Sequence, residues 1–336
     1  MTQFLSHHWK SLIFAGCLCL PAAVKAGDTA TVDSFHVAST FTSRASTDPF
    51  GRSLSSVTIR YRLYVPKNYN PAVKYPIVLT LHGTASGGTD NRAQLKFRFS
   101  RMWADDTLQA KQAMFVLAPQ SNATTDIWVT ILQRNRETSW RYDSMTINPA
   151  LQAAIQLYDS IKTAYSIDTT RQYVSGYSAG GYATYYLLNR FPRQWAAAVP
   201  ACACGDTNRA IVNTWLNTPI WMHQGSADTS VSVSCSRQMF ASLNRAYAAL
   251  GKDTANTLRY SEYPGADHTG GWENASRDPK VMPWAISKLV SPTAIRRGPQ
   301  NFRKGASGMV KGKPIDALGH KNSKFPSLKN VKISNP

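Results

Sequence analysis

The chain has 336 residues and a formal net charge of +19 at pH 7, and 43% of its residues are hydrophobic. This length and composition are ordinary for a soluble protein and suffice for one large domain with a sizeable core. Beyond residue 26 no apolar run is long enough for a membrane span, and no nucleic-acid-binding motif accompanies the positive charge. We therefore expect neither a membrane span nor a nucleic-acid partner.

Residues 1–26 have the pattern of a secretory signal peptide. Lys10 closes a short polar start, a mostly apolar run extends from Ser11 to Val24, and Val24 and Ala26 supply the small residues that a signal peptidase reads. A lipoprotein cleaved before Cys17 is the alternative, but little apolar sequence precedes that residue. The sequence therefore predicts an exported protein, extracellular or periplasmic.

The rest of the chain alternates between runs typical of strands and runs typical of helices. Residues 27–55 are polar and rich in Ser and Thr, and we interpret them as a lead-in. The predicted strands are 57–65, 75–81, 113–118, 172–176, 196–200, 218–224 and 258–263, and the predicted helices are 150–165, 182–188, 239–250 and 281–289. This order predicts an α/β domain over residues 56–290, with a mostly parallel sheet covered by helices on both faces.

Two connecting segments bear on the shape of a site. Only about seventeen residues separate Pro200 from Thr218, which leaves little room for the lid that enzymes of this architecture often carry there. Residues 120–149 form a longer, irregular segment rich in Arg and aromatic residues, among them Trp140. This segment predicts either one wall of a binding cleft or a surface loop whose aromatic rings cover the core.

Residues 291–336 form a basic tail. They contain ten Lys or Arg residues and a single acidic residue, Asp316, and few large apolar side chains. This composition predicts disorder. The tail could adhere to an anionic surface such as a cell-wall polymer, and the alternative is a solvated extension without a dedicated partner.

The cysteines indicate a disulfide rather than a metal site. Cys17 and Cys19 leave with the signal peptide, and the remaining three can oxidise in an exported protein. Cys235 can pair with either Cys202 or Cys204, and we take Cys204–Cys235 as the candidate disulfide. We expect no zinc, because no His lies nearby in the sequence to complete four ligands.

The stretch from Gly176 to Gly180 fits the pattern G-x-S-x-G. It follows a strand-like run and precedes a helix-like run, which is the context of a nucleophile elbow. Such a turn holds Ser178 in a strained conformation with its Oγ exposed, and small neighbours let the strand and helix backbones close around it. Ser178 is therefore the candidate nucleophile.

A serine nucleophile needs a base and a carboxylate that orients the base. Asp228 follows one predicted strand and His268 follows the next, in the order Ser, Asp, His, and both positions lie where parallel sheets place their ligands. Asp267 competes as the acid, but it adjoins His268 and is poorly placed to orient its ring. His82 is expected to hold its loop and His223 to lie in the core. Asp228 could instead cap the following helix.

The oxyanion of the reaction needs two backbone donors. The residue after the nucleophile, Ala179, supplies one amide, and the Gly-rich loop after strand 75–81 supplies the other, for which we select Thr84. A Gly-rich loop can also hold phosphate, but the chain lacks the G-x-x-x-x-G-K-[ST] pattern.

At this point the residues resemble the secreted esterase branch of the α/β-hydrolases. This branch includes the polyhydroxybutyrate-depolymerase and feruloyl-esterase-like proteins, and the phospholipase/carboxylesterase or "predicted peptidase" proteins related to prolyl oligopeptidase domains. The matching phrases are 60–66, 75–83, 167–176 leading into the elbow, 218–221 leading to Gly225 and Asp228, and 263–265 leading to His268 and Trp272. The chain departs from the pattern at Gln224, where a His often stands, at 202–204, which replaces a more glycine-rich stretch, and in its basic tail.

The resemblance implies a secreted serine hydrolase that cleaves carboxylic esters without a metal or organic cofactor. It carries over Ser178 as nucleophile, Asp228 as acid and His268 as base. The short lid suggests bulky or polymeric esters, of the polyester or feruloyl type, and we expect Tyr177, Trp272 and Trp140 to contact them. The alternatives are a serine peptidase of the prolyl-oligopeptidase type, which uses the same three residues, and a non-catalytic binding protein on this fold.

Overall fold

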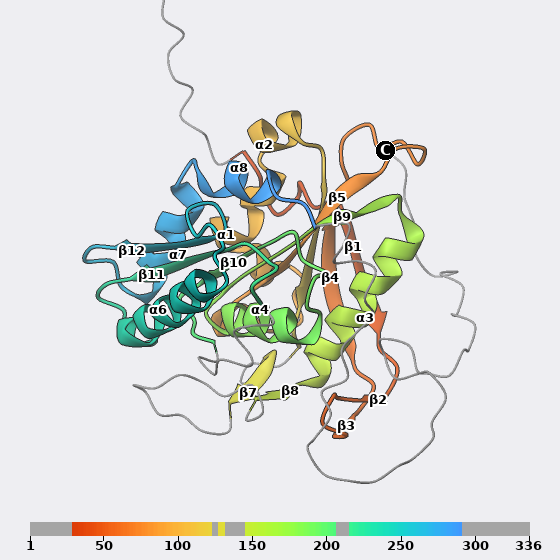
Figure 1. Ribbon diagram of the computed structural model, residues 1–336. Helices are drawn as coiled ribbons and strands as arrows, with labels where there is room; N and C mark the ends of the chain where they lie inside the picture. The colour runs from red at the N-terminus through yellow and green to blue at the C-terminus, as the bar shows by residue number, and fades with distance from the viewer. Residues whose placement is uncertain (1–28, 123–126, 132–144, 206–214, 291–336) are drawn as a thin grey trace, which may run out of the picture.

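A computed structural model of the chain describes residues 29–122, 127–131, 145–205 and 215–290 (Figure 1). The predicted signal peptide, the basic tail and Trp140 lie outside these residues, as does part of the segment after Pro200 on which the prediction of a short lid rests. Among the described residues, no helix has the length and apolar character needed to cross a membrane.

An eight-stranded sheet forms the centre of the molecule, in the order β1-β4-β6-β5-β9-β10-β11-β12. Its strands are β1 Val37–Thr42, β4 Thr58–Tyr64, β5 Tyr75–Leu81, β6 Phe115–Gln120, β9 Ile167–Tyr177, β10 Ala197–Ala201, β11 Ile220–Gly225 and β12 Leu258–Tyr263. The pairs β1–β4 and β4–β6 are antiparallel and the remaining pairs are parallel. Two short antiparallel pairs complete the strands: β2 Ser46–Thr47 with β3 Ser53–Leu54, and β7 Val129–Ile131 with β8 Met145–Ile147.

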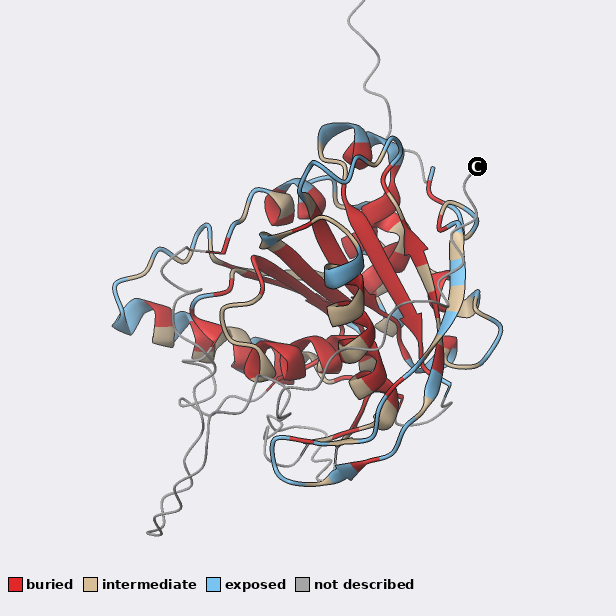
Figure 2. Ribbon diagram, turned by 90° about the vertical axis from the view of Figure 1, so that its right-hand side faces the viewer, coloured by how far each residue is buried: buried red, intermediate tan, exposed pale blue. Residues whose placement is uncertain are grey.

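Helices cover both faces of this sheet. They are α1 Arg98–Arg101, α2 Asp106–Lys111, α3 Pro149–Ala164, α4 Ala179–Arg190, α6 Val233–Ala249, α7 His268–Arg277 and α8 Val281–Ile286, with 3-10 turns η1 Thr84–Ser86, η2 Ala93–Leu95 and η3 Met102–Ala104. One apolar cluster joins the sheet to α3, α4 and α6, and a second joins it to α1, α2, α7 and α8. Figure 1 shows the two groups on opposite sides of the strands, and Figure 2 shows the buried sheet between them.

The strand β5 shows why a strand at the centre of this sheet is mostly apolar. Ile77, Leu79 and Leu81 face the first cluster and Val78 faces the second, and each is at most 1% exposed. Because successive side chains of a strand point to opposite faces, a strand covered on both faces carries apolar residues at most positions, and in β5 only Thr80 is polar apart from the Tyr75 hydroxyl. The predicted α/β class and two-faced sheet are confirmed.

The register of the parallel strands brings their carboxyl ends level with one another. Leu81 pairs with Gly176, Tyr177 pairs with Ala201, and Gly225 pairs with Tyr263. The turns that follow these strands therefore meet along one edge of the sheet, which is where open α/β sheets bind their ligands.

Two elements differ from the sequence expectations. The segment interpreted as a lead-in contributes β1, an edge strand whose residues are alternately half-buried and exposed, so its Ser and Thr content concealed it. The sequence patterns predict no helix directly after β12, but α7 begins at His268 because the Asp267 carboxylate accepts a hydrogen bond from the Gly270 N–H and caps the helix.

Candidate active site

Ser178 occupies a sharp turn between β9 and α4. Its backbone has φ 53° and ψ −122°, in a region that residues other than glycine rarely adopt. A Cβ on Gly176 would lie 2.2 Å from the Gly180 carbonyl oxygen, and a Cβ on Gly180 would lie 2.0 Å from the Leu81 carbonyl oxygen. The two glycines of the motif are therefore required by close backbone packing, which holds the turn in its strained form.

A series of hydrogen bonds joins Ser178 to His268 and Asp228. His268 Nε2 lies 3.0 Å from Ser178 Oγ, and His268 Nδ1 lies 2.7 Å from Asp228 Oδ2. The Asp228 side chain is fully buried, whereas the His268 side chain is 20% exposed. The carboxylate therefore lies where it can orient the ring, and the serine oxygen lies at the opposite ring nitrogen.

The surroundings of Asp228 determine which nitrogen of His268 carries the proton. The Oδ1 atom of Asp228 accepts hydrogen bonds from the Ser230 and Val231 N–H groups, each at 2.9 Å. Its Oδ2 atom faces His268 Nδ1, so that nitrogen donates and Nε2 is left as an acceptor toward Ser178 Oγ. In this tautomer the ring can take the hydroxyl proton from the serine.

The two backbone amides selected as oxyanion donors are both at the start of a helical turn. Ala179 is the first residue of α4 and Thr84 is the first residue of η1, so neither N–H has a partner within its own helix. Neither donates a hydrogen bond to any other described residue. A Cβ on Gly83 would lie 3.2 Å from Ser178 Cβ, so the loop that carries Thr84 adjoins the serine. The two amides are available to an oxyanion.

The remaining buried histidines have structural partners. His82 Nε2 accepts a hydrogen bond from the Ser121 N–H, so its Nδ1 donates to the Gly83 carbonyl and holds the loop. His223 lies on β11 between the rings of Trp221 and Tyr263. Burial lowers the pKa of His82 to about 4 and that of His223 to about 3, so both rings are neutral at neutral pH. Both match the sequence expectation.

The structure also distinguishes Asp228 from Asp267, the two residues considered as the acid of the site. Asp267 directs its carboxylate to the Gly270 N–H, where it caps α7, and His268 instead faces Asp228. Asp228 does accept backbone hydrogen bonds from the residues after it, as expected of a cap, but through the oxygen that His268 does not use.

Two of the three expected substrate contacts need correction. Tyr177 is 1% exposed and Trp272 is 5% exposed. The Tyr177 hydroxyl is hydrogen-bonded to Ser86 Oγ at 3.0 Å, and its ring fills the space beneath Gly83. Tyr177 ends β9 and Trp272 lies on α7, and their rings pack against each other in the apolar core under the site. Trp140 lies outside the described residues.

One aromatic residue near the site was missed in the sequence. Phe97 is half-buried, and its ring packs against Tyr177 at 5.6 Å and against Trp272 at 5.5 Å between ring centroids. Trp272 in turn packs edge-on against His268 at 4.9 Å. No motif marks Phe97, since its position depends on how α1 folds against α7.

The cysteines divide between a disulfide and a buried thiol. Cys204 is bonded to Cys235, as our candidate pairing predicted, and Cys202 is free and buried. Potential metal-ligating atoms of Cys202, Asp228 and His268 lie within 4.8 Å of one another. Because Asp228 and His268 are already hydrogen-bonded to each other, and burial raises the pKa of the Cys202 thiol, this group is better described as part of the serine–histidine–aspartate site.

Comparisons with known proteins find similarity to hydrolases. The model of the prolyl oligopeptidase family matches residues 151–223, which contain the elbow. A bifunctional acetylxylan esterase/xylanase from Neocallimastix patriciarum is 26% identical over 138 residues, which are 41% of this chain and 17% of the fungal enzyme.

Solved structures with the same fold include esterases and peptidases. A thermostable esterase superposes with a TM-score of 0.61 at 31% identity, over 76% of this chain and 64% of the esterase. The acylaminoacyl peptidase of Pyrococcus horikoshii superposes with a TM-score of 0.50 at 13% identity, over 76% of this chain and 42% of the peptidase. The chain thus spans less than two thirds of the length of each of these relatives.

Proposed function

We propose that this chain is a serine hydrolase that cleaves carboxylic esters, as its similarity to an acetylxylan esterase and to a thermostable esterase supports. The observation that carries the proposal is the hydrogen-bonded series from Ser178 through His268 to Asp228 at the carboxyl edge of the sheet. A serine hydroxyl is a poor nucleophile at neutral pH, and this series supplies the base that activates it.

The reaction follows from the positions of these atoms. Ser178 Oγ attacks the ester carbonyl carbon while its proton passes to His268 Nε2, and the buried Asp228 carboxylate stabilises the imidazolium that forms. The Ala179 and Thr84 amides donate to the carbonyl oxygen as it becomes an oxyanion. His268 then protonates the departing alcohol, and water attacks the acyl-enzyme by the same route to release the acid and restore Ser178.

Esters are favoured over peptides by the more similar relative. The thermostable esterase is 31% identical over most of this chain, whereas the acylaminoacyl peptidase shares the fold at 13% identity. Peptide hydrolysis is the second candidate, because the family model that covers the elbow is that of the prolyl oligopeptidases and the same three residues serve both reactions.

The substrate class and location are further parts of the proposal. The acetylxylan esterase relative supports an ester carried on a large molecule, as does the little sequence available for a lid. Export is supported by the signal-like residues 1–26 and by the Cys204–Cys235 disulfide, which persists in oxidising compartments. N-terminal sequencing of protein recovered from the periplasm or the culture medium tests cleavage near residue 26.

The deciding experiment measures hydrolysis of nitrophenyl esters of increasing acyl length beside a chromogenic peptide, using wild type and Ser178→Ala. We expect ester turnover in wild type and its loss in the variant, with thermal unfolding curves that show both proteins folded. The dependence of kcat/KM on acyl length then sizes the acyl site. Peptide turnover without ester turnover would establish the peptidase, and no turnover from folded wild type would favour a binding protein.

A further inference from the structure

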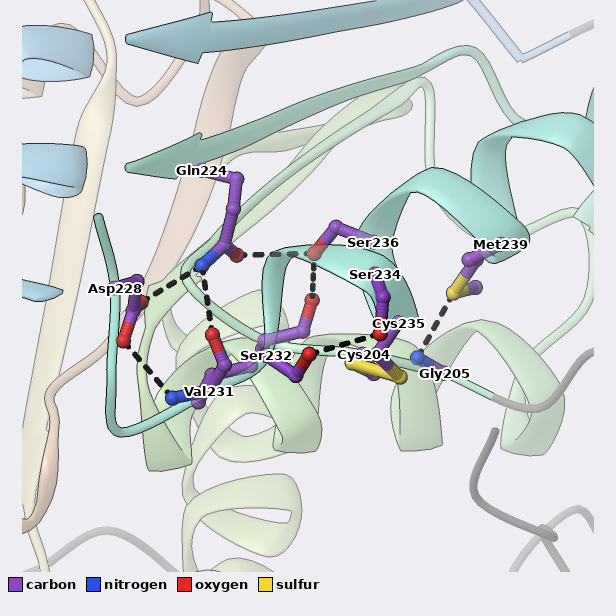
Figure 3. The surroundings of a disulfide bond; sticks show 11 residues. Cys204, Gly205, Gln224, Asp228, Val231, Ser232, Ser234, Cys235, Ser236 and Met239 are labelled. Atoms are coloured by element: carbon purple, nitrogen blue, oxygen red, sulfur yellow. Dashed lines mark hydrogen bonds between the residues drawn. A yellow bond between two sulfur atoms is a disulfide. The ribbon is translucent and has the colours of Figure 1, made fainter. Parts of the chain in front are cut away.

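Gln224 is a buried amide that contacts the acid of the site. It lies at the end of β11 with no exposed surface, and its Nε2 donates to Asp228 Oδ2 at 2.7 Å and to the Val231 carbonyl at 3.1 Å. Its Oε1 accepts a hydrogen bond from Ser236 Oγ at 2.9 Å. Figure 3 shows the amide between these three groups.

The oxygen that Gln224 contacts is the one that orients His268. Asp228 Oδ2 accepts from both Gln224 Nε2 and His268 Nδ1, whereas Oδ1 accepts from two backbone N–H groups. A buried carboxylate depends on such donors, because it has lost its hydration. Gln224 is neutral, so it fixes the carboxylate without offering a competing positive charge.

The orientation of the amide is determined by its partners. If its oxygen and nitrogen exchanged places, the oxygen would face both the Asp228 carboxylate and the Val231 carbonyl, which are acceptors and would repel it. The Ser236 hydroxyl holds the opposite end of the amide by donating to Oε1. Ser236 therefore acts on Asp228 through Gln224, without touching the carboxylate itself.

The turn that carries Ser236 is tied to the segment after β10. Ser236 lies in the first turn of α6, directly after Cys235, whose disulfide partner is Cys204. Three residues later, Met239 Sδ accepts a hydrogen bond from the N–H of Gly205, which adjoins Cys204. Figure 3 shows both links beside the Ser236–Gln224 contact.

We propose that Gln224 is a positioning residue for Asp228, and that the disulfide-tethered first turn of α6 holds it through Ser236. The inference rests on the proposed hydrolase function, because the Asp228–His268 pair is the part of the site that Gln224 aligns. It connects the disulfide to the nucleophile by an unbroken series of contacts.

Replacing Gln224 tests the first half of the proposal. Gln224→Leu keeps the volume and removes the donor, and we expect kcat to fall about 10- to 100-fold with little change in KM, as for loss of a hydrogen bond to a charged group. Gln224→His offers one donor and one acceptor in a neutral ring and should recover most of the loss. Equal kcat values for the two variants would overturn the proposal.

Ser236→Ala tests the second half, with Ser234→Ala as its matched control. The Ser234 hydroxyl lies in the same turn and bonds to Ser232 Oγ instead of to Gln224. We expect a loss in kcat of about 3- to 10-fold for Ser236→Ala and less than about twofold for Ser234→Ala. The double variant Cys204→Ser with Cys235→Ser should lose about as much kcat as Ser236→Ala. In a Gln224→Leu background, Ser236→Ala should lower kcat little further, because Ser236 acts on Asp228 through Gln224. Equal losses of kcat in Ser236→Ala and Ser234→Ala would contradict the proposal that Ser236 acts through Gln224. So would fully additive effects of Ser236→Ala and Gln224→Leu on the free energy of activation.

A substrate-independent measurement separates this proposal from the proposed function. The far-downfield proton resonance of His268 Nδ1–H reports its hydrogen bond to Asp228, and it should shift or broaden in Gln224→Leu and Ser236→Ala but not in Ser234→Ala. If wild type cleaves no ester, the rate at which a fluorophosphonate labels Ser178 replaces kcat. A resonance unmoved in all variants would overturn the positioning role, whereas absence of ester turnover and of labelling, with a shifted resonance, would overturn only the hydrolase function.

Discussion

The Nε2 atom of His268 lies 3.0 Å from the Oγ of Ser178, although 90 positions of sequence separate the two residues. Their strands, β9 and β12, are not neighbours in the sheet. The contact forms because α7 crosses the ends of the intervening strands at close range: a Cβ on Gly271 would lie 2.3 Å from Cys202 Sγ and 2.9 Å from the Gly225 nitrogen. The absence of a side chain at Gly271 therefore lets the helix carry its first residue to the serine.

Asp228, which contacts His268 in space, and Asp267, which precedes it in the sequence, should differ sharply in their effect on kcat. Asp228→Asn presents an amide to His268 Nδ1, which favours the wrong tautomer and removes the charge that stabilises the imidazolium, so we expect kcat to fall about 10⁴-fold. Asp267→Asn makes the same chemical change in a residue that caps α7, and Asn is also a good cap. Its kcat should stay within about threefold of wild type. Steady-state ester kinetics of both variants checks this, and a larger loss in Asp267→Asn would reassign the acid.

The oxyanion donor proposed at position 84 is a backbone group, so its test is a proline. Thr84 is the first residue of η1 and follows Gly83 in an extended conformation with ψ 172°, and both features accommodate proline. Thr84→Pro removes the N–H and should lower kcat about 10²- to 10³-fold. Thr84→Ala removes only the exposed side chain and should leave kcat nearly unchanged. Similar kinetics for the two variants would remove Thr84 from the oxyanion site.

Tyr177 should affect stability more than substrate selection. Tyr177→Phe removes the buried hydroxyl that bonds to Ser86, which should lower the free energy of unfolding by about 1 kcal/mol. Because the ring lies beneath Gly83, kcat/KM for short and long nitrophenyl esters should change by the same factor. Phe97→Ala is the informative contrast, since that half-buried ring packs on Trp272 beside the site. Selective loss of the long esters in Tyr177→Phe would restore a direct substrate contact.

Because His82 and His223 are buried in the neutral form, we expect the folded protein to lose stability in acid. Burial holds the folded-state pKa of His223 at about 3 and of His82 at about 4, below the ordinary value of 6.5, so the unfolded chain binds more protons between these values. The free energy of unfolding should therefore fall as the pH falls below about 6.5, by up to about 1.4 kcal/mol per pH unit for each ring. Urea unfolding across this range measures the slope.

His223→Phe is the variant that isolates one of these rings. It keeps an aromatic side chain between Trp221 and Tyr263 and removes the titrating group, so its stability should depend less steeply on pH than that of wild type. An unchanged slope would mean that His223 does not titrate with unfolding.

Much of the fold was readable from local patterns. The strands at 75–81 and 258–263 have the predicted bounds, since each is a short apolar or alternating run that ends at a turn signal. The edge strand β1 escaped prediction because only one side of it meets the core, which allows Ser and Thr at most positions. The helix α7 was not predicted, because Asp267 directly precedes His268 and an acidic residue there fits a candidate catalytic acid as well as a helix cap.

The sequence by itself determined the α/β class, the strained serine turn and the order of the candidate Ser, Asp and His, because these depend on residue type and on spacing to the adjacent strand. Only the tertiary structure decided which groups meet. In the structure, Tyr177 and Trp272 are buried beneath the site and Phe97 packs against them. Gln224 lies between Asp228 and Ser236. Such contacts depend on how helices from distant segments pack across the strand ends, and no local pattern encodes that packing.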